Sequence, residues 1–364
     1  MNTITNMASI LPNRQVKKYF FFLACILLSF CTSCKDIGKL VDKQKSSSYF
    51  IDSKGQVVYC QNGNWFSLGI LQMQADAKSF EVLAEDIGKD KDSVYFRNMT
   101  QKLVDRNSFY VDNQVPKDRF HVYYIDQVLG FNVIEGADPK TYELISNHIN
   151  WARDKDHYFY SNDMIQADRE TFTFVNDFFL KDKDSVYVSP NIGDFRSVMP
   201  NTGNVEAINK YYMRIANTVC YPPFQQGSAA ITKSFDSIHT IRVLDQDIIC
   251  VNNKTILFRG KDFKYTAVDA TSFQLFPVDE KDGIYADNPY SKDKNHIYYN
   301  QEIVPDADVK TFIPIGRDFG KDTKNVYYQK QRLEGVDAAS FKKDGDFYKD
   351  KRGNKFSALT GNKV

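Results

Sequence analysis

Short apolar triplets, each preceded by a polar turn sequence, recur along most of the chain. The triplets are rich in Val, Ile, Tyr and Phe, and most follow a cluster such as Asp-Lys-Asp or Asp-Lys-Asn. Asp and Asn favour turns because their side chains hydrogen-bond to nearby backbone, whereas β-branched and aromatic residues favour strands. The pattern therefore predicts a series of β-hairpins. The turn motifs begin at Asp90, Asp118, Asp154, Asp182, Asp293 and Asp322, with a truncated copy at Asp350.

A second motif, Ala-Asp-x-x-Thr-Phe or a close variant, alternates with the first. Its Asp is expected to cap a single helical turn, and its final aromatic residue is expected to enter the core. The spacing is regular, as from Phe80 to Asp90, where the aromatic residue lies ten positions before the turn Asp (90 − 80 = 10). The copies are Ala75–Phe80, Ala137–Tyr142, Ala167–Phe172, Val268–Phe273, Ala307–Phe312 and Val336–Phe341.

The two motifs together define a repeat of about 28 residues, as from Asp154 to Asp182 (182 − 154 = 28). One such unit is too small to bury its aromatic face, so neighbouring units must stack on one another. The predicted fold class is mainly all-β, with tandem β-hairpin or meander repeats and short helical turns. We favour an open array over a closed propeller because the unit is shorter than the roughly 40 to 50 residues of common propeller blades.

The segment Asp293–Tyr299 resembles the Asp-Lys-Asn-Tyr-Tyr signature of the DKNYY family. The resemblance covers about residues 75–190 and 262–351. It implies a repeat protein, often lipid-anchored, of Gram-negative or related bacteria. It implies no activity that can be carried over to this chain.

The N-terminus has the pattern of a bacterial lipoprotein signal. A basic segment with Arg14, Lys17 and Lys18 precedes an apolar segment, Tyr19–Phe30, which is too short to span a bilayer. The small residue Ser33 precedes Cys34, as in a lipobox. We predict a signal peptide over residues 1–34 and lipidation of Cys34, with the mature chain attached to a membrane of the cell envelope, the outer membrane being favoured. The alternatives are an uncleaved signal anchor and an ordinary secretory signal.

The mature chain divides by composition into five parts. The expected order is a polar tether over 35–48, a repeat array over 49–190, a central segment over 191–248, a second array over 249–356 and a tail over 357–364. The central segment is an insertion, a degenerate repeat or a domain junction, with a helix expected over 205–218 and then Tyr221-Pro222-Pro223-Phe224. A hairpin turn at Asn252-Asn253 is expected where repeats resume.

Composition limits the class of partner. Lys and Arg number 47 against 46 Asp and Glu, so no net field attracts nucleic acid, and we exclude nucleic-acid binding. Aromatic residues make up 14% of the chain, which suits half-buried β-surfaces.

The repeated aromatic residues are candidate ligand-binding groups. In each triplet the middle side chain lies on the strand face opposite the outer two, so one ring per copy could join an exposed ladder that stacks on sugar rings. Packing inside the core is the alternative, and the strength of aromatic pairs in hairpins favours it. The candidates are Tyr95, Tyr123, Phe159, Tyr187, Tyr298 and Tyr327.

Cysteine and histidine offer little further chemistry. Cys220 and Cys250 are candidates for a disulfide, with buried free thiols as the alternative, and Cys60 is left without a pairing partner. Three of the five His residues, His121, His157 and His296, share a turn position that holds Ser or Asn in other copies, which argues against a catalytic or metal-binding role. The repeated Asp-x-Asp pairs are a weak calcium signal, because the second acid is replaced in some copies. We predict no metal and no cofactor.

The sequence therefore predicts a non-catalytic lipoprotein of the cell envelope, attached to the membrane through its N-terminal lipid. Its β array would act as a binding or scaffold surface for an envelope protein or a glycan. The alternative is a hydrolase whose site lies in residues 191–248, near Asp236, His239 and Asp245.

Overall fold

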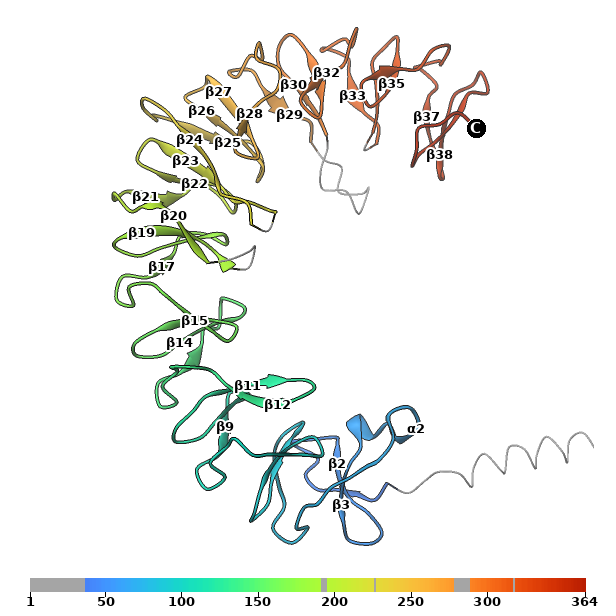
Figure 1. The fold of residues 1–364 in the computed structure, drawn as a ribbon. Helices are drawn as coiled ribbons and strands as arrows, with labels where there is room; N and C mark the ends of the chain where they lie inside the picture. Colours follow the sequence, from blue (N-terminus) through green and yellow to red (C-terminus); the bar gives the residue numbers. More distant parts are fainter. Residues whose placement is uncertain (1–36, 191–194, 226, 278–288, 317) are drawn as a thin grey trace, which may run out of the picture. The chain divides into compact units, whose positions relative to one another are not determined.

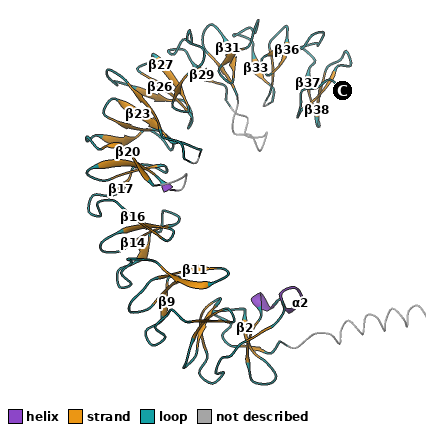
Figure 2. Ribbon diagram, in the orientation of Figure 1, coloured by secondary structure: helices purple, strands orange, loops and turns teal. Residues whose placement is uncertain are grey.

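The computed structural model consists almost entirely of small antiparallel β-sheets (Figure 1), and Figure 2 shows how little helix accompanies them. It describes residues 37–190, 195–225, 227–277, 289–316 and 318–364. The helices include a 3-10 turn at Gln61–Gly63 and α2, Trp65–Leu68, and Pro190 also has 3-10 geometry. None of the sheets described there closes into a barrel, which agrees with the predicted open array. The chain forms two compact units, Met1–Gln166 and Ala167–Val364.

The sheets of the first unit are meanders, in which each strand pairs with the next strand in sequence. The four-stranded sheets are β1 (Lys39–Leu40), β2 (Tyr49–Ile51), β3 (Val57–Tyr59) and β4 (Leu71–Gln72); β5 (Glu81–Ala84), β6 (Ile87–Lys89), β7 (Val94–Phe96) and β8 (Met99–Gln101); and β13 (Glu143–Leu144), β14 (Trp151–Arg153), β15 (Tyr158–Tyr160) and β16 (Asp163–Ile165). Two-stranded pairs are β9 (Tyr110–Asp112) with β10 (Val115–Lys117), and β11 (Tyr123–Asp126) with β12 (Gly130–Val133).

The second unit repeats the four-stranded meander and ends in a three-stranded sheet. In chain order its sheets are β17 (Thr173–Phe174), β18 (Phe179–Lys181), β19 (Ser185–Val188) and β20 (Arg196–Pro200); β21 (Val205–Ala207), β22 (Met213–Ile215), β23 (Thr218–Tyr221) and β24 (Ile231–Ser234); β25 (Ile241–Val243), β26 (Ile248–Val251), β27 (Thr255–Phe258) and β28 (Lys261–Asp262); β29 (Gln274–Leu275), β30 (Tyr290–Lys292), β31 (Ile297–Tyr299) and β32 (Glu302–Ile303); β33 (Ile313–Pro314), β34 (Phe319–Lys321), β35 (Val326–Tyr328) and β36 (Gln331–Arg332); and β37 (Lys342–Asp344), β38 (Phe347–Lys349) and β39 (Lys355–Ser357).

Each turn motif forms a tight turn between two strands, as the sequence predicts; the flanking strands are paired in every copy except that of Asp118, where a single bridge between Lys117 and Val122 closes the turn. At Asp90, between β6 and β7, the Oδ1 atom accepts the backbone N–H groups of Asp92 and Ser93 at 2.8 and 2.7 Å. This bond pattern closes the turn locally and needs no contact from the rest of the chain. The same cap recurs at Asp118, Asp154, Asp182, Asp293 and Asp322. At Asp350 the donors are the N–H groups of Arg352 and Asn354, two and four positions on.

Each Ala-Asp motif forms a single helical turn that leads into the first strand of a sheet, again as predicted. At Asp308, before β33, the backbone carbonyl accepts the N–H of Phe312 at 2.9 Å, and the side chain accepts the hydroxyl of Thr311 at 2.8 Å. Phe312 is buried in the core. We refer to this turn as the corner.

The second carboxylate oxygen of the turn Asp joins the turn to the corner and to a tyrosine. Asp293 Oδ2 accepts the backbone N–H of Asp269, from the corner, and the hydroxyl of Tyr298, both at 2.8 Å. The corner hydroxyl of Ser272 accepts the N–H of Lys294 at 2.9 Å. We call this arrangement the Asp lock. Complete locks centre on Asp90, Asp118, Asp182, Asp293 and Asp322.

The copies differ in two respects. At Asp154 the tyrosine is replaced by Phe159, which has no hydroxyl, while the bond from the N–H of Asp138 is kept at 2.9 Å. The corner and turn Asp are 14 residues apart in the copy of Asp90 but 24 apart in the copy of Asp293. The lock therefore tolerates different loop lengths.

One corner of the structure is not among those predicted from the sequence. Residues 104–109 form it: Asp105 donates its N–H to Asp118 Oδ2 at 2.8 Å, and Ser108 Oγ accepts the N–H of Arg119 at 3.1 Å. Val104 stands where most copies have Ala, as Val268 and Val336 do in two other copies. The detectable signal is an Asp followed three positions later by Ser, 13 residues before the turn Asp.

Neighbouring sheets share their cores, as expected for stacked repeats. Tyr95, the middle residue of β7, packs in one cluster with Tyr49 and Tyr59 of the first sheet. The outer residues of β7, Val94 and Phe96, pack in another cluster that includes Phe109, Tyr123 and Phe131. Both faces of the sheet are therefore covered by its neighbours in the chain.

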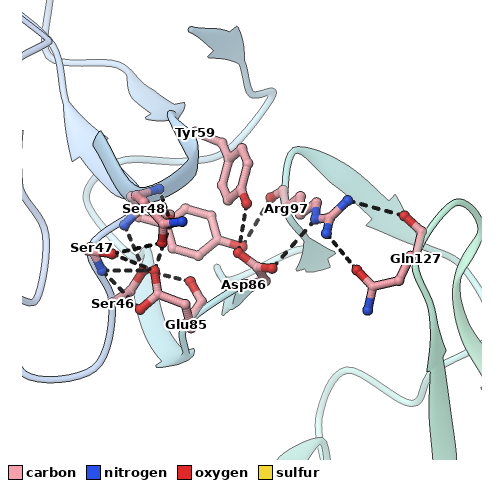
Figure 3. Close-up of polar contacts among 10 residues, drawn as sticks. Ser46, Ser47, Ser48, Tyr59, Glu85, Asp86, Arg97 and Gln127 are labelled. Carbon is pink, nitrogen blue, oxygen red and sulfur yellow. Dashed lines mark hydrogen bonds and ion pairs between the residues drawn. The ribbon is translucent and has the colours of Figure 1, made fainter. Parts of the chain in front are cut away.

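A further carboxylate connects consecutive sheets. Asp86, at the turn between β5 and β6, accepts the hydroxyl of Tyr59 from the preceding sheet at 2.6 Å and lies 3.5 Å from Arg97 (Figure 3). Two turns of the second unit repeat this contact, in which Asp247 accepts from Tyr221 and Asp318 from Tyr299.

The central segment is a degenerate repeat, and the expected helix over 205–218 is wrong. Strands β21, β22 and part of β23 occupy that range and belong to a four-stranded meander. The reason is local, because Asn209 Oδ1 accepts the N–H groups of Tyr211 and Tyr212 at 2.9 and 2.7 Å and so forms a hairpin turn. The hairpin predicted at Asn252-Asn253 is confirmed, with φ values of 54° and 52°.

The predicted polar tether over 35–48 is wrong for most of its length. Lys39–Leu40 forms β1, and Ser46 and Ser48 are buried. Figure 3 shows Glu85 among the three serines of this segment: it accepts the N–H and hydroxyl of Ser47 at 3.0 and 2.8 Å and the hydroxyl of Ser48 at 2.7 Å. These serines hydrogen-bond to the carboxylate of Glu85 instead of to water, and the bonds attach the segment to the second sheet.

Replacing Tyr298 by Phe tests the Asp lock. The substitution removes a hydroxyl from a side chain with 0% exposure and leaves Asp293 one donor short, so we expect a loss of roughly 1 to 3 kcal/mol in the free energy of unfolding. Urea unfolding followed by circular dichroism measures it. Tyr110→Phe is the control because Tyr110 is 41% exposed, and it should change stability by less than about 0.5 kcal/mol. Equal stability of the two variants would contradict the lock.

The locks also predict acid sensitivity. Burial would raise the pKa of Asp293, but the N–H of Asp269, the hydroxyl of Tyr298 and the turn amides together lower it below its ordinary value of 3.8. A group whose pKa is lowered by folding stabilises the protein above its unfolded pKa, and this contribution is lost as the pH falls through the folded pKa. The pKa values of Asp90, Asp118, Asp182 and Asp322 are lowered in the same way.

We therefore expect the unfolding free energy to be nearly constant above about pH 5 and to fall progressively below about pH 4. Urea titrations at successive pH values measure this profile. Asp293→Asn removes one titrating group, so it should make the acid fall shallower. A profile that stays as steep in this variant would show that Asp293 does not contribute.

Candidate functional site

The six candidate aromatic residues lie in the core, so the ligand-facing interpretation is wrong and the packing alternative is correct. None of them is more than 9% exposed. Strand alternation shows which side chains share a face, but here neighbouring sheets cover both faces. Five of the six donate their hydroxyl groups to the Asp locks, and the sixth, a Phe, has none. The residues are Tyr95, Tyr123, Phe159, Tyr187, Tyr298 and Tyr327.

The histidines of the turn motif lie at the rim of the locks. His121, His157 and His296 have side-chain exposures of 45%, 38% and 33%, and each Nδ1 atom is 3.7 to 3.8 Å from the Oδ1 of its turn Asp. That oxygen already accepts two backbone N–H groups. Over the residues that the structure describes, no three His, Cys, Asp or Glu side chains come together in a group that could hold a metal ion.

The residues named for a hydrolase are not brought together. His239 Nε2 lies 2.9 Å from Ser237 Oγ in an exposed segment. Asp236 uses its backbone carbonyl to accept from Asn217. Asp245 alone of the three hydrolase candidates lines the groove described below.

Cys220 and Cys250 are free and fully buried, so the structure has the thiol alternative and no disulfide between them. They lie in separate clusters, Cys220 with Phe179 and Met213, and Cys250 with Ile256 and Phe273. Burial raises the pKa of Cys220 to about 12, which keeps its thiol protonated and unreactive. Cys60 is also free and buried, and Cys34, the residue predicted to be lipidated, lies outside the described residues.

A groove of about 1120 Å³ opens in the second unit, beside the loop between β23 and β24. Its wall includes Tyr221-Pro222-Pro223-Phe224, the part of the central segment that departs most from the repeat. The β25–β26 turn contributes Asp245, Gln246 and Asp247, and the β27–β28 turn contributes Arg259. The groove is therefore built by turns from successive sheets of one unit.

Aromatic rings form one side of the groove. The ring centroids of Tyr211 and Phe224 are 5.3 Å apart, and those of Tyr221 and Phe224 are 5.6 Å apart. The ring of Phe178 also contacts both Tyr211 and Phe224, with a centroid distance of 5.3 Å to each. Phe224 is nevertheless 53% exposed. An exposed ring that is held by aromatic neighbours is suited to stacking against a ligand.

The charges of the groove are balanced and largely paired. Arg259 lies 3.0 Å from Asp247, and Lys233 lies 2.7 Å from Asp262. Burial and the hydrogen bond to Asp247 raise the pKa of Tyr221, so its hydroxyl stays protonated as a donor. The charged lining residues are Asp245, Asp247 and Asp262 against Arg259, Lys261 and Lys264.

Asparagine side chains hold the rim in place. Asn176 Nδ2 donates to the backbone carbonyls of Asn209 and Tyr212 at 3.0 and 3.1 Å. Asn209 Nδ2 in turn donates to the carbonyls of Asp245 and Gln246, both at 3.2 Å. The equivalent turns of three successive sheets are thereby joined by hydrogen bonds.

Sequence reasoning noted the Pro-Pro segment as irregular but did not assign a groove to it. The available signal was the absence of any charged residue between Arg214 and Lys233 in a chain with 26% charged residues. Such an uncharged stretch indicates a contact surface more readily than a solvated loop.

Comparison with protein families gives one match. The model of the DKNYY family matches residues 39–163 and 161–356. No curated protein matches the chain, and no solved structure matches it either. Across the described residues, no helix has the length and apolar character needed to cross a membrane.

Proposed function

The chain belongs to the DKNYY family, and on this premise we propose that it is a non-catalytic lipoprotein of the cell envelope whose β array binds a neutral glycan. The observation that carries the binding proposal is the exposed ring of Phe224 in a groove whose charges cancel. Attachment to the membrane through a lipid on Cys34 is supported by the basic and apolar segments of the leader and by Ser33-Cys34.

A neutral ligand rich in hydroxyl groups suits the groove best. Three carboxylates and three cations line it, so it offers no net charge to an acidic or basic ligand. The amides of Gln225 and Gln246 supply both donors and acceptors, which is what hydroxyl groups require. The C–H face of a sugar ring can pack against Phe224. An envelope protein remains the other outcome of the test.

Binding of uncharged oligosaccharides tests this proposal. Full-length protein solubilised from membranes in detergent is titrated with oligomers of hexose and of N-acetylhexosamine by calorimetry. Phe224→Ala removes the stacking surface, and we expect it to weaken binding by about tenfold, equivalent to about 1.4 kcal/mol. The matched control is Phe120→Ala, which truncates another exposed Phe, 57% exposed, far from the groove in sequence.

The results of these experiments distinguish a glycan from an envelope protein as the partner. Saccharide binding that depends on Phe224 but not on Phe120 supports the proposal. Absence of saccharide binding, together with a protein crosslinked by a photoreactive residue at position 224, would replace the glycan by an envelope protein.

Lipidation is tested by substitution of the cysteine. Cys34→Ala should abolish incorporation of labelled palmitate and release the chain from the membrane fraction, because the acylated residue is lost. Cys31→Ala is the control, since the cysteine three positions earlier is not the acceptor, and it should be labelled normally. Labelling that persists in Cys34→Ala would refute the assignment.

A further inference from the structure

The fold begins almost directly after the proposed lipid site. Residue 37 already packs, with Leu40, against Phe50, Val58 and Cys60. Three residue steps separate it from Cys34, and they span at most about 11 Å even when fully extended. Ser46–Ser48 are tied to Glu85, so no long flexible tether follows. If Cys34 is lipidated, as the proposed function requires, the first sheet lies at the bilayer surface.

The same sheet carries an exposed apolar loop between β3 and β4. Phe66 is 86% exposed, Leu68 is 50% exposed and Leu71 is 42% exposed. The rings of Trp65 and Phe66 contact each other edge to face at 5.9 Å. We call Trp65–Leu71 the apolar loop.

The apolar loop is held next to the point where the chain enters the fold. Trp65 and Ile70 pack on the cluster of Phe50, Val58 and Cys60, to which Ile37 also belongs. Asn64 caps α2 by accepting the N–H of Ser67 at 3.2 Å. The loop is thus a fixed part of the first sheet, and its outward side chains are presented close to Ile37.

The loop is also free of charge. No Asp, Glu, Lys or Arg occurs between Lys54 and Asp76, although charged residues make up 26% of the chain. Trp and Phe are the residues that favour the interface between lipid and water, where a charged neighbour would oppose insertion.

We propose that the apolar loop is a second membrane contact, which inserts Phe66, Leu68 and Leu71 into the interfacial region of the bilayer that holds the lipid on Cys34. The lipid supplies the attachment, and the loop fixes how the first sheet is oriented on the surface. A lipid anchor combined with an apolar protein contact holds a chain more firmly than either alone.

Tryptophan fluorescence tests the proposal. The chain has 2 Trp residues, and Trp151 is 4% exposed, so lipid-dependent changes report mainly on Trp65. The full lipidated chain is reconstituted into vesicles of phosphatidylethanolamine and phosphatidylglycerol with brominated acyl chains. We expect quenching in the wild type and loss of most of that quenching in Trp65→Phe.

Two double variants sharpen the test. Phe66→Ser with Leu68→Ser keeps the reporter and should lower the quenching at least about twofold, because the side chains that insert are lost. Val128→Ser with Leu129→Ser is the matched control: these residues are 76% and 71% exposed in the turn between β11 and β12, and quenching should not change.

Co-flotation with vesicles distinguishes the two proposals. A chain that does not float refutes lipid attachment itself. A chain that floats but shows no quenching of Trp65 refutes the second contact alone. A photoreactive residue at position 66 that crosslinks a protein in the envelope instead of lipid would also overturn it.

Discussion

The structure depends on a buried carboxylate that satisfies three different parts of the chain at once. In each complete lock, one oxygen of the turn Asp accepts two amides of its own turn, and the other accepts a corner amide and a tyrosine hydroxyl. The carboxylates at Asp118 and Asp293 are 0% and 2% exposed, which would be costly without these donors. The donors to each carboxylate come from its own turn, from the tyrosine that follows and from the corner that precedes it. Each repeat therefore compensates the cost of burying its own Asp.

The aromatic residues connect the interiors of neighbouring sheets, as the locks connect the turns to the corners. Tyr95 packs toward the preceding sheet, while Val94 and Phe96 pack toward the following one. A single meander has too little interior of its own, and its stability must be shared with its neighbours.

Sequence reasoning recovered the parts of the fold that are encoded locally. The Asp-led turns, the corners and the Asn252-Asn253 hairpin all follow from hydrogen bonds within a few residues, and all are present. The role of the tyrosines was harder, because periodicity does not reveal how many faces of a strand are covered. The helix expected over 205–218 failed because Asn209 directs a turn that the apolar pattern does not reveal.

The groove likewise could not be predicted from local sequence. It combines the Pro-Pro segment with turns from Asp245–Asp247 and Arg259, and only the fold shows that these meet. Likewise, the polarity of the serine triplet predicts a tether. Its partner, Glu85, lies more than thirty residues away, at separations of 37 to 39 positions.

The unequal spacing of the locks has a consequence for how such a chain can diversify. Lengthening the segment between corner and turn from 14 to 24 residues costs only about 0.5 kcal/mol of loop-closure entropy. One connection per repeat is therefore open to insertion, whereas the residues that close the lock are not. Such an array can acquire new surface loops one repeat at a time. Its binding surface can therefore change while its scaffold is kept.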